Sequence, residues 1–496
     1  MQFNSINFMI FFPIVIAVYF IIPRKLRSIW LLLASYYFYM SWNAKYALLI
    51  GFSTIVTYFT ARAIEGVDNN DKRLRKEILI AGIVINLAIL IIFKYADFAI
   101  DTVDAVMNRI GLTGIDYRLN LLLPVGISFY TFQAIGYVID VYRGETVAET
   151  NIIRYALFVS FFPQLVAGPI ERSKNLLGQL RKIEEIDLFN AKRVTSGAIL
   201  MIWGLFLKMV ISDRIAILVD NVFDNYRMQG GTALILAAIG FSIQIYCDFN
   251  SYSTVAIGAA RVMGFSLMEN FNSPYFANSI RDFWGRWHIS LSTWFRDYLY
   301  IPLGGNRKGK LRKHINRMIV FLVSGLWHGA NFTFIVWGGI HGLYQTIGEL
   351  LRPIRDRVND RIQVNTTCFS YRFGQIIVTD ILAVFAWIFF RADTLTDAMR
   401  FIKRIFTRFD PWQLFNGGIF ELGLDRIEMN ILVVALLVLL AVDLMKYLKG
   451  KTIDAFLMEQ NLWFEWIVII LFILALFIFG EYGPAFDAKQ FIYFQF

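Results

Sequence analysis

The sequence predicts an all-α polytopic membrane protein with about eleven transmembrane helices, because its apolar residues recur in segments close to bilayer-spanning length, roughly 17–25 residues. Of the 496 residues, 57% are hydrophobic and only 17% are charged. Soluble domains average about 25% charged residues, so this chain has more apolar surface than one soluble core can bury. The composition therefore excludes an ordinary soluble enzyme, a nucleic-acid-binding module and a disordered scaffold.

The charge of the chain also suits a membrane protein. Lys and Arg number 48 against 38 Asp and Glu, which gives a net charge of +10, and the basic residues lie mainly between the apolar segments. Cytoplasmic loops of membrane proteins carry such an excess, so we expect membrane lipids, and no nucleic acid, as neighbours. Cys247 and Cys368 fit neither a disulfide framework nor a metal-ligand spacing, and we expect no metal.

The first apolar segment, Phe8 to Ile22, has no basic residue before it and Arg24-Lys25-Leu26-Arg27 directly after it. A cleaved signal peptide carries its positive charge on the other side. We therefore expect this segment to remain as a span with its N-terminus outside and its basic end in the cytoplasm. Further candidate spans follow at 29–41, 45–64, 78–98, 119–139, 195–218, 231–263, 316–348, 376–390, 430–447 and 462–480.

The middle of the chain, residues 120–345, differs from the ends because Gly, Pro, His, Asp and Trp interrupt its apolar segments. Pro163 and Gly168-Pro169 break Leu157–Ile170, which favours a re-entrant segment over a simple span. Such backbone is tolerated at membrane depth only where protein buries it or where it lines a wet cavity. We therefore treat 1–496 as a single integral membrane domain whose functional region is 120–345.

Four histidines are candidates for chemistry. His314 lies in the basic segment Asn306–Arg317 and is expected in a solvated loop, whereas His328 lies inside the apolar stretch from Met318 to Tyr344. An ionisable residue within a span indicates a functional site, and imidazole takes up a proton near neutral pH. The alternative for His328 is a hydrogen bond to a neighbouring helix, and the residues alone favour neither.

The roles of the other two histidines, His341 and His288, depend on how the surrounding helices are arranged. If one helix carried both His328 and His341, a rise of 1.5 Å per residue would separate them by roughly 20 Å, so His341 is expected to support helix packing or to lie at an interface. His288 lies in Arg281–Asp297, whose tryptophans and arginines follow helical spacing. We expect an interfacial amphipathic helix there, with its arginines pointing outward. The alternative is that His288 turns inward from this helix toward His328.

Asp248, within Gln244–Tyr252, is a second buried ionisable candidate. Intramembrane carboxylates pair with a cation or with a polar cavity. We expect Asp248 to form a structural salt bridge, with the arginines of Arg281–Arg296 as the supply of positive charge.

Six segments together resemble the membrane-bound O-acyltransferase family, in the bacterial polysaccharide branch that modifies alginate, peptidoglycan and teichoic acid. The resemblance covers most of the chain and is densest where the sequence runs ENFNSPYFANSIRDFWGRWHISLSTWFRDYLYIPLGG. The segments are Phe3–Pro23, Leu123–Tyr142, Phe161–Arg172, Glu269–Gly305, Ser324–Gly342 and Trp387–Thr394. One departure is DFNSYST, with Thr254 where the alginate branch usually has Asp.

The resemblance implies that His328, in the Trp-His-Gly motif, is the active-site histidine and that His288, in the Arg-Trp-His motif, is its partner. It implies a fold whose helices surround a central tunnel in the bacterial cytoplasmic membrane. Acetyl-CoA is the implied acyl donor, and an extracytoplasmic partner acyltransferase or a polysaccharide the implied acceptor. His328 would act as general base, while His288 would orient the reacting groups or stabilise the oxyanion.

Further residues are expected to line the tunnel or hold the donor. Arg281, Arg286 and the basic turn around Lys308 are candidates for the phosphates of the donor or for lipid headgroups. The remaining candidate substrate or tunnel residues are Trp284, Trp287, Trp327, Asn331, Asp282, Asp248 and Gln244.

Two other classes of function fit a polytopic membrane protein with intramembrane histidines. A transporter or flippase for a polysaccharide precursor, with a histidine proton relay, should show repeats with broken helices at matching positions. A non-catalytic scaffold for a polysaccharide synthase should tolerate alanine at both His328 and His288.

Overall fold

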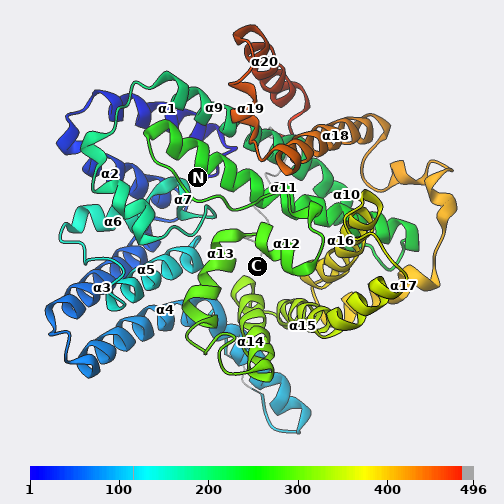
Figure 1. The fold of residues 1–496 in the computed structure, drawn as a ribbon, viewed down its shortest axis with the longest axis horizontal. Helices are drawn as coiled ribbons and strands as arrows, with labels where there is room; N and C mark the ends of the chain where they lie inside the picture. Colours follow the sequence, from blue (N-terminus) through cyan, green and yellow to red (C-terminus); the bar gives the residue numbers. More distant parts are fainter. Residues whose placement is uncertain (115–116, 483–496) are drawn as a thin grey trace. The chain divides into compact units, whose positions relative to one another are not determined.

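The computed structural model describes residues 1–114 and 117–482, and every regular element within them is a helix. Figure 1 shows these helices in chain order. The predicted all-helical membrane fold is confirmed. The chain divides into unit 1, Met1–Met201 with Val255–Met268, and unit 2, Ile202–Thr254 with Glu269–Phe496. The assignment of 1–496 to one domain with its functional region at 120–345 stays a prediction.

Unit 1 contains the N-terminal helices, the first part of α9 and the last part of α11, and the rest of α9 and α11 belongs to unit 2. Helices α3, α4 and α5 pack against one another, and α2 packs against α6. The elements are α1 (Ile6–Ile21), η1 (Arg24–Leu26), α2 (Arg27–Met40), η2 (Ala44–Tyr46), α3 (Ala47–Gly66), α4 (Lys72–Arg109), α5 (Ile127–Tyr142), α6 (Ile152–Ser160), α7 (Phe162–Leu165), η3 (Ser173–Leu177), α8 (Gly178–Leu180), η4 (Ile183–Glu185) and α9 (Ala191–Phe206).

Unit 2 contains both candidate histidines. Its elements are η5 (Leu207–Ser212), α10 (Asp213–Asp224), α11 (Gly231–Met263), η6 (Pro274–Phe276), α12 (Ile280–Arg286), α13 (Ile289–Phe295), η7 (Arg296–Tyr300), α14 (Lys310–His328), α15 (Phe332–Arg361), α16 (Phe369–Arg391), α17 (Leu395–Thr407), η8 (Pro411–Leu414), η9 (Gly418–Glu421), α18 (Arg426–Lys449), α19 (Ile453–Leu457) and α20 (Leu462–Phe479).

Seven helical segments of the described residues are long and apolar enough to cross a membrane. Their surroundings differ: 78% of the most apolar window of α11 is buried, whereas Ile469 is the single buried residue of α20. Helix α11 is therefore a core helix, whereas α20 presents apolar side chains to its surroundings. Several other predicted spans are helices below that length, including α1, α2 and α5 with 16, 14 and 16 residues.

The predicted break in Leu157–Ile170 is present. Helix α6 ends at Ser160, α7 covers only Phe162–Leu165, and the chain then leaves the helical conformation. Every residue of this segment is buried, and Gln164 donates to the backbone carbonyl of Phe158 at 3.1 Å. Protein therefore covers the interrupted backbone, as a break at membrane depth requires.

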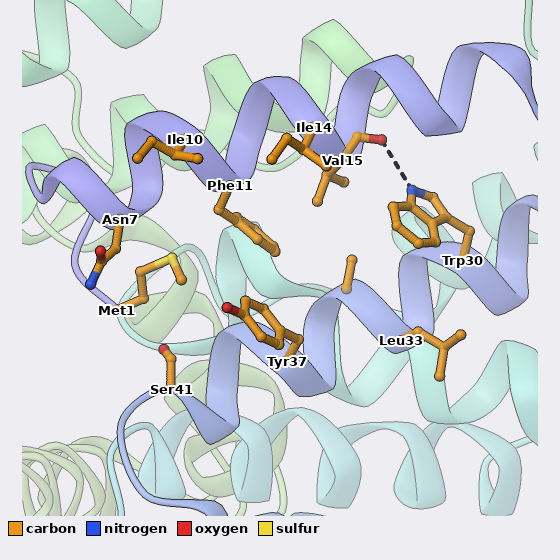
Figure 2. Close-up of a pocket in the computed structure, with 11 residues that line it drawn as sticks. Met1, Asn7, Ile10, Phe11, Ile14, Val15, Trp30, Leu33, Tyr37 and Ser41 are labelled. Carbon is orange, nitrogen blue, oxygen red and sulfur yellow. Dashed lines mark hydrogen bonds between the residues drawn. The ribbon is translucent and has the colours of Figure 1, made fainter.

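A groove separates α1 from α2 and has a cavity volume of about 560 Å³. Figure 2 shows Phe11 and Tyr37 facing each other across it and Trp30 donating its indole N–H to the Val15 carbonyl at 3.0 Å. The side chains along it are mostly apolar, and Ile10 and Ile14 are more than half exposed. The groove is thus suited to hydrocarbon chains, and it contains none of the candidate site residues.

Helices α14 and α15 form a tight antiparallel hairpin, joined by only three residues, 329–331. A Cβ added to Gly325 would lie 2.2 Å from the Phe334 carbonyl oxygen, and one added to Gly338 would lie 2.2 Å from the Phe321 carbonyl oxygen. Glycine at these two positions therefore allows the two backbones to approach each other closely. The hairpin replaces the single stretch 316–348 that hydropathy predicted.

We expect Gly325→Ala and Gly338→Ala each to lower the free energy of unfolding by about 1–3 kcal/mol, because an added methyl group must push the helices apart. The measurement is chemical unfolding of the purified protein in detergent micelles. Gly348→Ala is the matched control on α15, since nothing lies within 4 Å of its Cβ position. An equal loss of stability in all three variants would contradict the close-approach argument.

Candidate functional site

His288 lies at a sharp break in the helix that the sequence predicts over 281–297. Helix α12 ends at Arg286 and α13 begins at Ile289, with His288 as its N-cap in the left-handed region at φ 42° and ψ 56°. A left-handed conformation is uncommon for a residue other than glycine and is often found at functional sites. The prediction of one continuous amphipathic helix is therefore wrong, because the break turns His288 inward.

The His288 side chain is 1% exposed. Its ring centroid lies 6.2 Å from Phe249, 6.2 Å from Phe271 and 6.1 Å from Trp327. Burial lowers the pKa of His288, which lies outside the candidate membrane spans, to about 3. The imidazole is therefore neutral at physiological pH and is able to accept a proton or a hydrogen bond.

His328 is the last residue of α14 and is 4% exposed. Its ring lies 5.0 Å from Trp327, 5.1 Å from Trp337 on α15 and 5.4 Å from Phe390 on α16. Both His288 and His328 therefore pack beside the same indole, Trp327, although 40 residues separate them in the sequence. Trp327 thus links the two histidines that the sequence marks as candidates.

His341 also lies close to His328, and the 20 Å separation calculated for a continuous helix does not apply. Trp337 lies between them, with its ring centroid 5.1 Å from His328 and 5.2 Å from His341. Trp284 donates its indole N–H to Nδ1 of His341 at 3.2 Å, and Phe283 and Phe321 stack on the His341 ring. His341 is therefore held within an aromatic cage.

The three candidate tryptophans are interior residues. Trp284, Trp287 and Trp327 are 8%, 2% and 2% exposed, whereas an interfacial helix would place its tryptophans at the level of the headgroups. Trp287 packs against Trp387 at 5.1 Å, and Trp284 packs against Trp337 at 5.7 Å. These residues enclose the histidines in aromatic surface, and their lining of a tunnel stays a prediction.

The salt bridge predicted for Asp248 exists, but its partner differs from the one expected. Lys208 on η5 lies 2.6 Å from an Asp248 carboxylate oxygen and 2.9 Å from an Asp213 oxygen. All three side chains are at most 12% exposed. The arginines of 281–296 were the wrong source of charge, because η5 brings a lysine of the span itself to α11. Gln244 lies one turn before Asp248 on α11, and its backbone carbonyl accepts a hydrogen bond from the Ser212 hydroxyl at 3.3 Å.

The remaining candidates occupy the ends of helices. Arg286 pairs with Asp282 at 2.9 Å, and its guanidinium lies 5.4 Å from the Tyr447 ring centroid. Arg281 is exposed on α12. Asn331 caps α15 by accepting from the Thr333 N–H and donates to the Asp393 carbonyl at 2.9 Å. Lys308 is exposed in the turn before α14.

Sequence reasoning did not single out Asn270, whose amide oxygen lies 3.1 Å from His288 Nδ1, or Lys208. Asn270 lies in the segment ENFN at the start of the densest motif, so its position was a usable signal, but its contact with His288 depends on the break at 287–288. Across the described residues, no group of three or more His, Cys, Asp or Glu side chains is arranged to hold a metal ion.

Comparison with known proteins places this helical membrane protein in a class of membrane acyltransferases. The chain belongs to the membrane-bound O-acyltransferase family, whose profile matches residues 145–387 and so includes both histidines. It is 39% identical to the probable alginate O-acetylase AlgI of Pseudomonas aeruginosa over 441 residues, which cover 88% of this chain and 81% of that protein.

Two further relatives extend the comparison. The peptidoglycan O-acetyltransferase of Helicobacter pylori is 36% identical over 79% of this chain and 77% of its own length. The teichoic acid D-alanyltransferase of Bacillus subtilis is 29% identical over 46% of this chain and 59% of its own length. The protein is therefore a multi-pass membrane acyltransferase, and the family resemblance predicted from its motifs is confirmed.

Proposed function

We propose that this protein moves an acetyl group from cytoplasmic acetyl-CoA across the bacterial cytoplasmic membrane for O-acetylation of an exported cell-surface polysaccharide. One observation carries the proposal: His288 and His328 are buried beside Trp327 in a member of the O-acyltransferase family. Relatives over most of the chain are named for O-acetylation of alginate and peptidoglycan, which supports an acetyl group and a polysaccharide acceptor.

The depth of His328 supports transfer across the membrane. The charged end of the α14–α15 hairpin is marked by Glu349, which pairs with Lys313 and with Arg317, the latter at 2.6 Å. His328 lies eleven positions after Arg317 on α14, and at 1.5 Å per residue this distance is roughly 16 Å. That is about half of the 30 Å hydrocarbon thickness, so His328 would lie near the middle of the bilayer, within reach of substrates from either side.

The proposed chemistry is transfer of an acyl group from a thioester to a hydroxyl. His328 takes the proton of the attacking hydroxyl, whose oxygen forms a bond to the thioester carbonyl carbon while the carbon–sulfur bond breaks. His328 then returns the proton to the departing thiolate, so no other reactant is needed. The aromatic surface around His328 excludes water, which strengthens these interactions and protects the thioester from hydrolysis.

Exposed basic residues outside the aromatic site are proposed to hold the phosphates of the donor. Arg281 and Lys308 are exposed and so are accessible to an anionic ligand. Arg286 is already paired with Asp282 and is better placed to orient α12 than to bind a phosphate on its own. On the outer side we propose an extracytoplasmic partner acyltransferase that completes delivery to the polysaccharide.

The test uses acetyl-CoA labelled in its acetyl group and membranes from matched cells with and without this chain. We expect base-labile label in the exported polymer only when the chain is present, with unchanged polymer export. Unchanged acetylation together with impaired export would contradict the proposal and would support a transporter. The polymer that carries the label identifies the acceptor.

A further inference from the structure

A short segment before α12 holds His288 in place. The Ile289 N–H donates to the Asn270 carbonyl at 2.9 Å, and the Asn272 N–H donates to the Arg286 carbonyl at 2.9 Å. The segment is itself anchored to α18, where Lys446 donates to the Phe271 carbonyl at 2.7 Å. The Asn270 side chain is thereby fixed directly beside the His288 ring, and both residues are 1% exposed.

The orientation of the Asn270 amide follows from its partners. Its Oδ1 accepts the backbone N–H of Ser290 at 3.2 Å and the Ser290 hydroxyl at 2.9 Å. Its Nδ2 donates to the Ser253 hydroxyl on α11 at 3.1 Å. A backbone N–H is only a donor, so the atom that it contacts is the amide oxygen, and a flipped amide would place two donors against each other.

The same oxygen lies 3.1 Å from Nδ1 of His288. An amide oxygen is only an acceptor, so His288 Nδ1 must carry the hydrogen. In a neutral imidazole the other nitrogen, Nε2, then carries the lone pair. The low pKa that burial imposes on His288 makes this neutral tautomer the one present at physiological pH.

His341 provides the opposite case in the same aromatic region. Its Nδ1 receives the indole N–H of Trp284 at 3.2 Å, and an indole nitrogen is only a donor. The Nδ1 atom of His341 is therefore the acceptor, and its hydrogen is on Nε2. The chain thus holds two buried histidines in different tautomers, each set by one neighbouring side chain.

We propose that Asn270 is a positioning residue that holds His288 in the Nδ1–H tautomer and so presents the Nε2 lone pair as a hydrogen-bond acceptor. In its effect on the reaction, this inference rests on the proposed function. An Nε2 lone pair accepts from the attacking hydroxyl and orients it, but it does not donate to an oxyanion. Of the two roles open to His288, orientation of the reacting groups is therefore the one this tautomer performs.

The direct test is nitrogen NMR of the full chain in lipid nanodiscs, with only its four histidines labelled with 15N. The two neutral tautomers give different pairs of nitrogen shifts. We expect one buried histidine of Nδ1–H type, whose signals disappear in His288→Gln, and one of Nε2–H type, whose signals disappear in His341→Gln. An Nε2–H or doubly protonated His288 at neutral pH would overturn the proposal whatever the acetylation activity.

Variants at Asn270 test the cause. Asn270→Leu removes the acceptor and is expected to abolish the fixed Nδ1–H signature and to lower the acetylation rate roughly tenfold or more, because a histidine in the wrong tautomer no longer presents the required nitrogen. Asn270→Asp keeps the acceptor and is expected to keep both the signature and most of the rate. Asn272→Leu, the same change two residues away at a half-buried position, is the matched control and should resemble wild type.

The outcomes separate this inference from the proposed function. If the wild-type protein shows the Nδ1–H signature but His288→Gln acetylates at the full rate, the tautomer assignment stands and His288 has no part in the reaction. A signature unchanged in folded Asn270→Leu would overturn the role of Asn270. If Asn270→Leu does not fold, the wild-type spectrum and Asn270→Asp still decide the proposal.

Discussion

Replacing His328 with alanine is expected to lower the rate of acetyl-ester formation by about 10²–10⁴, the range that a positioned general base contributes. The side chain lies among Trp327, Trp337 and Phe390, so alanine removes the base and leaves the aromatic wall. His328→Gln keeps a polar side chain of similar size but no basic nitrogen, and we expect the same loss. The measurement is ester formed per unit of folded protein in membranes at matched expression.

His341→Phe is the matched control for this prediction. His341 is equally buried, lies on the other arm of the same hairpin and also contacts Trp337, yet its Nδ1 is occupied by the Trp284 indole. Phenylalanine keeps the ring stacking, so we expect activity within a few-fold of wild type. If His328→Ala retained more than a tenth of the activity, or if His341→Phe lost as much as His328→Ala, the assignment of the base to His328 would be wrong.

The spans were predictable because hydropathy depends on local sequence. The segment predicted at 231–263 coincides with α11 (Gly231–Met263). The segment predicted at 78–98 lies inside the longer α4 (Lys72–Arg109), because the helix continues at both ends through charged residues that hydropathy does not count as part of a span. Composition and period identify the part of a helix that faces hydrocarbon, but they do not mark where the backbone stops being helical.

The two breaks beside the site differ in how far they could be foreseen. The turn at 329–331 carries local signals, a glycine after the last residue of α14 and Asn331 as the N-cap of α15, which typically end one helix and begin the next. The break at His288 has no such signal, because its left-handed backbone is held by hydrogen bonds from the segment around Asn270. Periodicity over 281–297 therefore predicted one helix where tertiary contacts make two.

The partner of Asp248 was hidden for a related reason. Lys208 lies in the middle of an apolar segment, and a hydropathy window averages its charge away. The structure places it in η5, a π-helical stretch between α9 and α10, and π-helical insertions often mark functional positions within helices. Which cation meets a buried carboxylate depends on how two helices pack, and the sequence of either helix alone does not contain that information.

The Lys208 cluster leads to the largest expected effect on stability. Lys208 is the cation between Asp213 and Asp248, so Lys208→Met leaves two buried carboxylates facing each other without it. Breaking a buried pair in this way costs about 3–5 kcal/mol. We expect the free energy of unfolding in detergent micelles to fall by that amount, with a matching loss of folded protein in the membrane.

The expected loss of stability comes from the two uncompensated carboxylates and not from the missing lysine side chain. Variants that neutralise the carboxylates separate these two causes. Asp248→Asn leaves the ion pair of Lys208 and Asp213, whose net charge is zero, and should lower the free energy of unfolding by less than Lys208→Met does. Combining Lys208→Met with Asp213→Asn and Asp248→Asn removes all three charges, and we expect it to recover much of the stability, since a buried ion pair is often replaceable by neutral groups at little cost. A triple variant no more stable than Lys208→Met would show that packing around Lys208, and not its charge, holds η5 against α11.

Because Phe249, the residue after Asp248, packs on the His288 ring, the triple variant also tests the link between the cluster and the site. Recovery of acetylation together with stability would indicate that the cluster acts by keeping α11 in place beside the site.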